Sequence, residues 1–127
     1  ATGFSNGGFW VSYLTGTSKV SAGVSHYGVW KANFGREMTN PYPMKYFSKS
    51  STPILALHGD DDETQRLKFA EEAWGEIKSR GATIETHVYS GAGHAWDRKR
   101  HRKYIFNEYV DKDAHKRTIE FFKKYMK

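Results

Sequence analysis

The chain has 127 residues, of which 38% are hydrophobic and 16% aromatic, with a formal net charge of +6 and no cysteine. This length suits a single domain over residues 1–127 with a real core, and the composition excludes a disordered chain. The missing thiols exclude disulfide scaffolds, thiolate metal sites and cysteine nucleophiles. No apolar run is long enough to cross a bilayer and no signal-peptide pattern opens the chain, so we expect no membrane association and favour the cytoplasm.

Much of the positive charge lies in one run, Arg98–Lys103. Such a run suits binding to nucleic acid or to an acidic surface. No interleaved aromatic residues and no nucleic-acid-binding module accompany it, so we favour a solvated surface segment over a nucleic-acid partner.

The chain opens on Gly3-Phe4-Ser5-Asn6-Gly7, which fits the pattern G-x-S-x-G. That pattern marks a sharp turn from a strand into a helix, with the serine hydroxyl exposed at the turn. Only two residues precede it, so its supporting strand is expected to be a stub. A short helix is predicted over residues 6–14, with Gly16 as its stop.

Alternation of strands and helices is predicted for the rest of the chain. Buried strands are expected at 20–27 and, from a continuous apolar run, at 54–58 before Gly59. Residues 28–43 read as irregular, with a loop signal in Asn40-Pro41-Tyr42-Pro43. Helical spacing of Leu67, Ala70, Trp74 and Ile77 predicts a helix over 63–80, capped by Gly81.

The last two predicted elements are a strand at 83–89, broken by Ser90-Gly91-Ala92-Gly93, and a terminal helix at about 113–126. The helix is expected to turn Ile119, Phe122 and Met126 to one face. Strands alternating with helices of this length imply right-handed crossovers and a parallel α/β sheet.

Three chemically active features fall where predicted strands end. They are Ser5, the acidic cluster Asp60–Glu63 and His94. The order serine, acid, histidine is that of α/β-hydrolases. A serine hydroxyl needs an imidazole to take its proton, and the imidazole needs a carboxylate to orient it and to stabilise its charge.

Each feature also has a plain structural interpretation. Asp60–Glu63 would serve as the N-terminal cap and first-turn acids of the next helix, and Asp60 and Asp61 are given no other role. A lone G-x-S-x-G is weak evidence, and a lone loop histidine is more often a surface residue. Their joint position at strand ends, in one order, is what favours a catalytic site.

With these residues in view, the chain resembles the C-terminal half of a dienelactone hydrolase family protein. The doubled glycine of Gly3–Gly8 resembles the family's serine turn, and Ser90–Asp97 resembles its catalytic-histidine loop. Pro53–Asp62 resembles its acid strand, in which the acid lies four residues after the histidine. That spacing selects Asp62. Ala114–Phe122 is similar to the family's terminal helix.

The resemblance implies hydrolysis of acyl esters or lactones, small molecules, through an acyl-enzyme and without cofactor or metal. It implies that Ser5 attacks, that His94 is general base and then acid, and that Asp62 orients His94. Asn6 would supply one oxyanion N–H. Phe4, Trp10 and Trp96 flank these positions and are assigned either to an acyl pocket or to ordinary core packing. His26 and His58 are interpreted as structural.

Two departures from the family pattern shape the expectation. Many dienelactone hydrolases carry cysteine where this chain has Ser5, which points instead to carboxylesterase chemistry. The family's N-terminal half has no counterpart here, including the loop that gives the second oxyanion N–H. We therefore expect a truncated α/β-hydrolase fold, a short parallel sheet of about three strands flanked by helices.

An open sheet edge and an uncovered apolar face favour association, so a homo-oligomer or a complex with the missing N-terminal half is expected. Two other functions stay open. One is a catalytically silent truncated domain that acts in assembly or interaction. The other is a peptidase of the prolyl-oligopeptidase type, which shares the order of the three residues.

Overall fold

The computed structural model describes residues 1–30 and 43–126. Its four strands form one parallel sheet in the order of the chain. The strands are β1 (Thr2–Phe4), β2 (Gly23–His26), β3 (Ile54–Gly59) and β4 (Ile84–Tyr89). The helices are α1 (Asn6–Gly16), the 3-10 helix η1 (Pro43–Tyr46), α2 (Leu67–Ser79) and α3 (Glu108–Tyr125).

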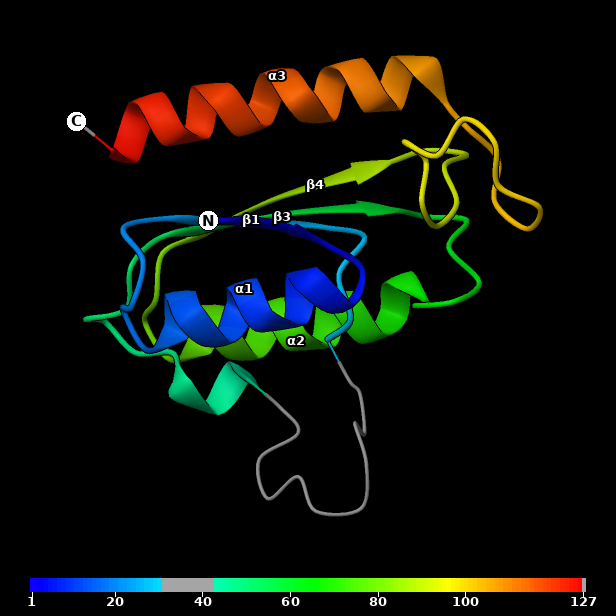
Figure 1. The fold of residues 1–127 in the computed structure, drawn as a ribbon. Helices are drawn as coiled ribbons and strands as arrows, with labels where there is room; N and C mark the ends of the chain where they lie inside the picture. Colours follow the sequence, from blue (N-terminus) through cyan, green and yellow to red (C-terminus); the bar gives the residue numbers. More distant parts are fainter. Residues whose placement is uncertain (31–42, 127) are drawn as a thin grey trace.

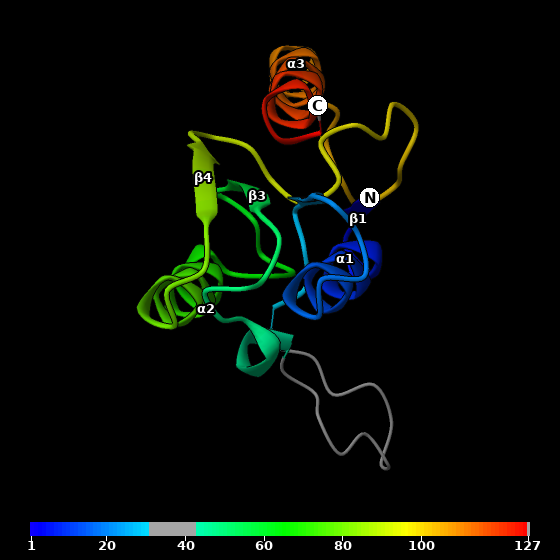
Figure 2. The ribbon, with the colours of Figure 1, turned by 90° about the vertical axis from the view of Figure 1, so that its left-hand side faces the viewer.

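The helices cover the sheet from both faces. Figure 1 and Figure 2 show α1 and α2 side by side against one face, and α3 alone against the other. Such a layered parallel sheet buries its middle strands on both faces, and all four residues of β2 are buried. All six residues of β3 are buried. The expected α/β sheet flanked by helices is confirmed.

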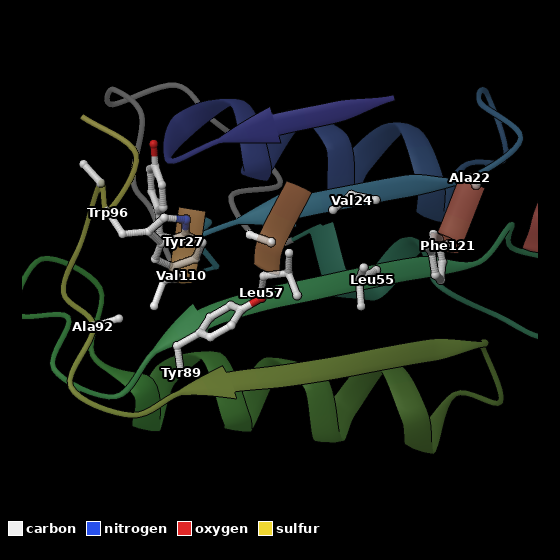
Figure 3. Packing of buried hydrophobic residues seen from close by; sticks show 12 residues of the cluster. Ala22, Val24, Tyr27, Leu55, Leu57, Tyr89, Ala92, Trp96, Val110 and Phe121 are labelled. Atoms are coloured by element: carbon white, nitrogen blue, oxygen red, sulfur yellow. The ribbon is translucent and has the colours of Figure 1, made fainter. Parts of the chain in front are cut away.

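Side chains of β3 alternate between two separate cores. Leu55 and Leu57 belong to the core beneath α3, which Figure 3 shows together with Val110 and Phe121 of that helix. Ile54 and Ala56 belong to the core on the α2 side. Because successive side chains of a strand point to opposite faces, this one apolar run holds both layers together.

Helix α2 follows its predicted face, with Ala70, Trp74 and Ile77 buried and Leu67 partly buried. Gly81 follows it with φ +84°, a left-handed conformation that suits a glycine after a helix. The predicted face of α3 is wrong. Its buried residues are Val110, Ala114 and Phe121, whereas Ile119 and Met126 are exposed and Phe122 is only partly buried.

Four strands are present where about three were expected. The short β1 is a true sheet member, because Thr2–Phe4 pairs with residues 24–26 of β2. The strand predicted at 20–27 is narrower, since β2 covers only Gly23–His26. The predicted irregular stretch 28–43, with its loop signal at Asn40–Pro43, lies mostly outside the described residues.

Candidate active site

Ser5 lies between β1 and α1 in a strained turn. Its backbone has φ 54° and ψ −115°, a conformation that residues other than glycine rarely adopt. The turn is closed by hydrogen bonds from the Ser5 N–H to the His26 carbonyl (3.0 Å) and from the Gly8 N–H to the Ser5 carbonyl (2.9 Å). The result places a half-buried serine hydroxyl at the carboxyl end of the sheet.

Glycine is required at two places in this turn. A Cβ on Gly3 would lie 2.3 Å from the Gly7 carbonyl oxygen, and one on Gly8 would lie 2.8 Å from the Gly28 Cα. Both distances are shorter than real contacts. The start of α1 therefore packs closely against β1 and against the backbone that follows β2, which restricts the turn that carries Ser5.

Asp62 lies in the loop after β3, where its side chain binds the backbone of the residues that follow it. Its Oδ1 accepts the backbone N–H groups of Thr64 (2.9 Å) and Gln65 (2.8 Å), and the side chain is fully buried. The helix-capping interpretation of Asp60–Glu63 is wrong, because α2 begins only at Leu67 and has no acid in its first turn. Asp60 instead accepts the Gly91 N–H (2.8 Å), which links the loops after β3 and β4.

His94 connects the other two side chains. Its Nε2 lies 2.9 Å from Ser5 Oγ, and its Nδ1 lies 2.8 Å from the Asp62 Oδ2. With Nδ1–H donating to the carboxylate, Nε2 is left as the acceptor for the serine hydroxyl. The structure thus brings together all three residues singled out by the sequence, from three strand ends.

The backbone N–H of Asn6 heads helix α1, directly after Ser5. The first N–H groups of a helix have no acceptor within the helix, and the helix dipole places positive potential there. This N–H therefore stands where negative charge on a substrate oxygen next to Ser5 would be stabilised.

A cavity of about 420 Å³ opens at Ser5 and His94. Of the aromatic residues proposed for a pocket, Phe4 lines this cavity. Trp96 does not, because it is only 1% exposed and packs in the core beneath α3. Trp10 is 52% exposed on the outer side of α1 and is not part of the cavity wall.

Sequence patterns missed two aromatic residues of the cavity wall, Tyr27 and Tyr104. Tyr27, directly after β2, packs its ring 4.8 Å from that of His94 and donates a 2.5 Å hydrogen bond to Asp97. Tyr104 covers His94 from another side (5.0 Å between rings), and its hydroxyl lies 3.0 Å from Thr64 Oγ1. Tyr27 has a usable signal, its place at a strand end, but Tyr104 lies in an irregular loop.

Burial and the hydrogen bond to Asp97 raise the pKa of Tyr27 well above its ordinary value. The phenol is thus neutral and donates. Arg98 and His101 also line the cavity, so part of the basic run Arg98–Lys103 lies at the candidate site.

Both histidines interpreted as structural are buried, His26 at 4% exposure and His58 at 0%. His26 Nε2 lies 3.0 Å from Thr2 Oγ1, and its ring stacks on Phe4. Burial lowers the pKa of His26 to about 4, so the ring is neutral near pH 7.

Among residues 1–30 and 43–126, no group of three or more histidine, aspartate or glutamate side chains is placed to hold a metal ion. In the same part of the chain, no helix has the length and apolar character needed to cross a membrane.

The chain is similar to proteins of known sequence and structure. The chain is 28% identical over 127 residues to a protein of Escherichia coli K12 named as a carboxymethylenebutenolidase, covering 98% of this chain and 45% of that protein. A crystal structure from Klebsiella pneumoniae, named as a dienelactone hydrolase, superposes with a TM-score of 0.80 at 26% identity, covering 98% and 51% of the two chains.

Esterase 2 of Thermogutta terrifontis, phosphorylated by paraoxon, gives a TM-score of 0.80 and covers 96% of this chain and 52% of its own. At 17% identity this likeness shows the α/β-hydrolase fold alone. The chain spans about half the length of the relatives it matches. The model of the dienelactone hydrolase family matches residues 1–126, so the chain belongs to that family.

Proposed function

We propose that the chain carries the catalytic triad of a serine esterase that hydrolyses acyl esters or lactones through an acyl-enzyme. The observation that carries this proposal is the pair of short contacts at His94, 2.9 Å to Ser5 and 2.8 Å to Asp62. Membership of a hydrolase family and esterases among the structural neighbours support the same chemistry.

In this mechanism His94 Nε2 takes the proton of the Ser5 hydroxyl as Oγ attacks the ester carbonyl carbon. Asp62 stays ionised and stabilises the imidazolium that forms. The proton then passes from Nε2 to the departing alkoxide as the acyl-enzyme forms. A water molecule, deprotonated by the same nitrogen, releases the acid and restores Ser5.

The carbonyl oxygen becomes negative in the tetrahedral intermediate, and the Asn6 N–H at the start of α1 supports it. Phe4, Tyr27 and Tyr104 give the cavity aromatic walls that suit an acyl or alcohol group of modest size. Which ester is preferred depends on the wall as a whole, so we propose only the class, small carboxylic esters and lactones.

The test compares the turnover of p-nitrophenyl acetate by the purified unmodified chain with that of the variants Ser5→Ala and His94→Ala. Removing either member of such a unit is expected to lower kcat by at least about 10³-fold, because each acts only with the other. Ser90→Ala and His115→Ala make the same changes at exposed positions and should keep full activity.

Absence of turnover above the Ser5→Ala background would favour the catalytically silent alternative. Comparison with a peptide p-nitroanilide separates an esterase from a peptidase of the prolyl-oligopeptidase type. The esterase proposal expects turnover of the ester only.

A further inference from the structure

His58 is a buried side chain next to the candidate site that the proposed mechanism does not use. It lies on β3, four residues before Asp62, and has no exposed surface. Its ring packs edge-on against Trp74 of α2, 6.1 Å between ring centres. A polar ring in an apolar core is costly unless its hydrogen bonds are made, so its contacts carry information.

One short contact determines which nitrogen of the His58 ring carries a hydrogen. His58 Nε2 lies 2.6 Å from the backbone carbonyl oxygen of Gln65. A carbonyl oxygen can only accept, so Nε2 carries the hydrogen. Nδ1 has no hydrogen-bond partner among the described residues, so a second hydrogen there would be buried without an acceptor, which favours the neutral ring.

The backbone N–H of the same residue, Gln65, is bound by the carboxylate of Asp62. Its N–H donates to Asp62 Oδ1 (2.8 Å), beside the N–H of Thr64 (2.9 Å). His58 therefore holds the carbonyl group of Gln65, while the N–H groups of Thr64 and Gln65 hold the Asp62 carboxylate. Loss of the His58 contact frees the turn from Asp62 to Gln65 to rotate, and with it the oxygen that His94 binds.

Burial gives a second reason for a neutral ring here, even though a carboxylate lies close to it. His58 Nε2 is 3.6 Å from Asp62 Oδ2, the oxygen that His94 Nδ1 binds. Burial lowers the pKa of His58 and His94 adds to this effect, while the hydrogen bond to Gln65 and the charge of Asp62 oppose it. Asp62 and His94 are the ionisable groups facing the ring, since α2 presents Trp74. A charged His58 would compete with His94 for one carboxylate.

We propose that His58 is a positioning residue, whose neutral Nε2–H holds the Gln65 carbonyl and thereby keeps the Asp62 carboxylate aligned with His94. The inference rests on the proposed function, because alignment matters only if Asp62 and His94 act together. It assigns a positioning role to a histidine that the sequence analysis interprets as structural.

The first test uses the unmodified protein and needs no enzyme activity. Nitrogen-15 NMR of the histidine rings, between pH 5.5 and 8, should show His58 neutral throughout, with its hydrogen on Nε2 and a coupling across the hydrogen bond to the Gln65 carbonyl. A ring that titrates in this range, or that carries its hydrogen on Nδ1, would overturn the proposal even if the protein is an active esterase.

The second test compares His58→Gln, which keeps an amide N–H within reach of Gln65, with His58→Leu, which fills the space without a donor. His58→Leu should lower kcat for p-nitrophenyl acetate about tenfold with KM within about twofold, because orientation is lost and binding is not. The low-field resonance of the His94 Nδ1 proton should move in the same variant. His58→Gln should retain both the kcat and the position of the His94 Nδ1 proton resonance.

Trp74→Phe is the matched control, since it loosens the same core without touching the Asp62 turn. Equal losses in His58→Gln and His58→Leu, or an unmoved His94 resonance in His58→Leu, would reduce His58 to a packing residue. If His58→Leu does not fold, the NMR experiment on the unmodified protein still tests the neutral Nε2–H form on which the proposal depends.

Discussion

Two neighbouring glycines after Ser5 have different surroundings. A Cβ on Gly8 would meet the Ser25 hydroxyl at 2.5 Å and the Gly28 backbone at 2.8 Å, whereas a Cβ on Gly7 would meet nothing within 4 Å. The hydroxyl can turn away, but the backbone of Gly28 cannot. The doubled glycine of the motif is thus required by packing at its second member only.

We therefore expect Gly8→Ala to lower the free energy of unfolding by about 1–3 kcal/mol, the range for an overpacked site. Gly7→Ala, the matched control within the same helix turn, should be neutral or stabilise by up to about 1 kcal/mol because alanine favours the helix. Urea unfolding of the two variants measures the difference. Equal stability of both would contradict the packing of α1 on β2 described above.

His26 makes the fold sensitive to acid. Its pKa is about 4 in the folded chain against 6.5 for a free histidine, chiefly because of burial. Between these values the unfolded chain binds a proton that the folded chain does not. Stability from the neutral ring is therefore present above pH 6.5 and is lost as the pH falls towards 4.

The expected slope is on the order of 1 kcal/mol per pH unit within this window. Thermal unfolding from pH 7 to pH 4 measures it, and His26→Gln should flatten the curve. His115→Gln is the control, because His115 is exposed and only weakly repels His26. An unchanged slope in His26→Gln would show that His26 is not the cause.

At the level of residues, the sequence identified those that stand at strand ends. Ser5, Asp62 and His94 were predictable because parallel strands carry their carboxyl ends to one edge of the sheet. Trp96 was ambiguous, since two positions after His94 fits a pocket wall as well as a core. Tyr104 was not predictable, because its place against His94 depends on the path of an irregular loop.

Among the elements, α3 departs most from prediction. It starts at Glu108, five residues before the predicted start at Asp113. The missed signal is Asn107, whose side chain accepts the Val110 N–H (3.1 Å), followed by acids in the first turn. The wrong face has another cause. Amphipathic spacing is satisfied by several registers, and the buried register is the one that includes the small Ala114 together with Val110 and Phe121.

Asn107→Ala should lower the free energy of unfolding by about 1 kcal/mol through loss of this cap. Asn107→Ser keeps a side-chain acceptor and should retain most of the free energy of unfolding that Asn107→Ala loses. Urea unfolding followed by circular dichroism checks both variants. A loss of the same size in Asn107→Ser would mean that the side chain acts through packing instead.

For the molecule as a whole, the sheet edge at β1 is the notable feature. Within the described residues β1 pairs only with β2, so its other side presents free backbone groups. Phe4 and Trp10, 44% and 52% exposed, add apolar surface on β1 and α1. Exposed edges and apolar patches of this kind favour association.

We accordingly expect the purified chain to self-associate, or to bind the segment that corresponds to the other half of its relatives. Size-exclusion chromatography with light scattering measures the mass in solution. Trp10→Lys, which places a charge on the exposed side of α1, should shift the population towards monomer. A compact, stable monomer at all concentrations would contradict the expectation.

Ser5, His94 and Asp62 are proposed to form a working nucleophilic site. Labelling of the purified chain with a fluorophosphonate probe, followed by mass spectrometry of its peptides, tests this most directly, because only an activated serine reacts. We expect one modified residue, Ser5, and loss of labelling in His94→Ala. No labelling of the folded chain, or labelling at another serine, would contradict it.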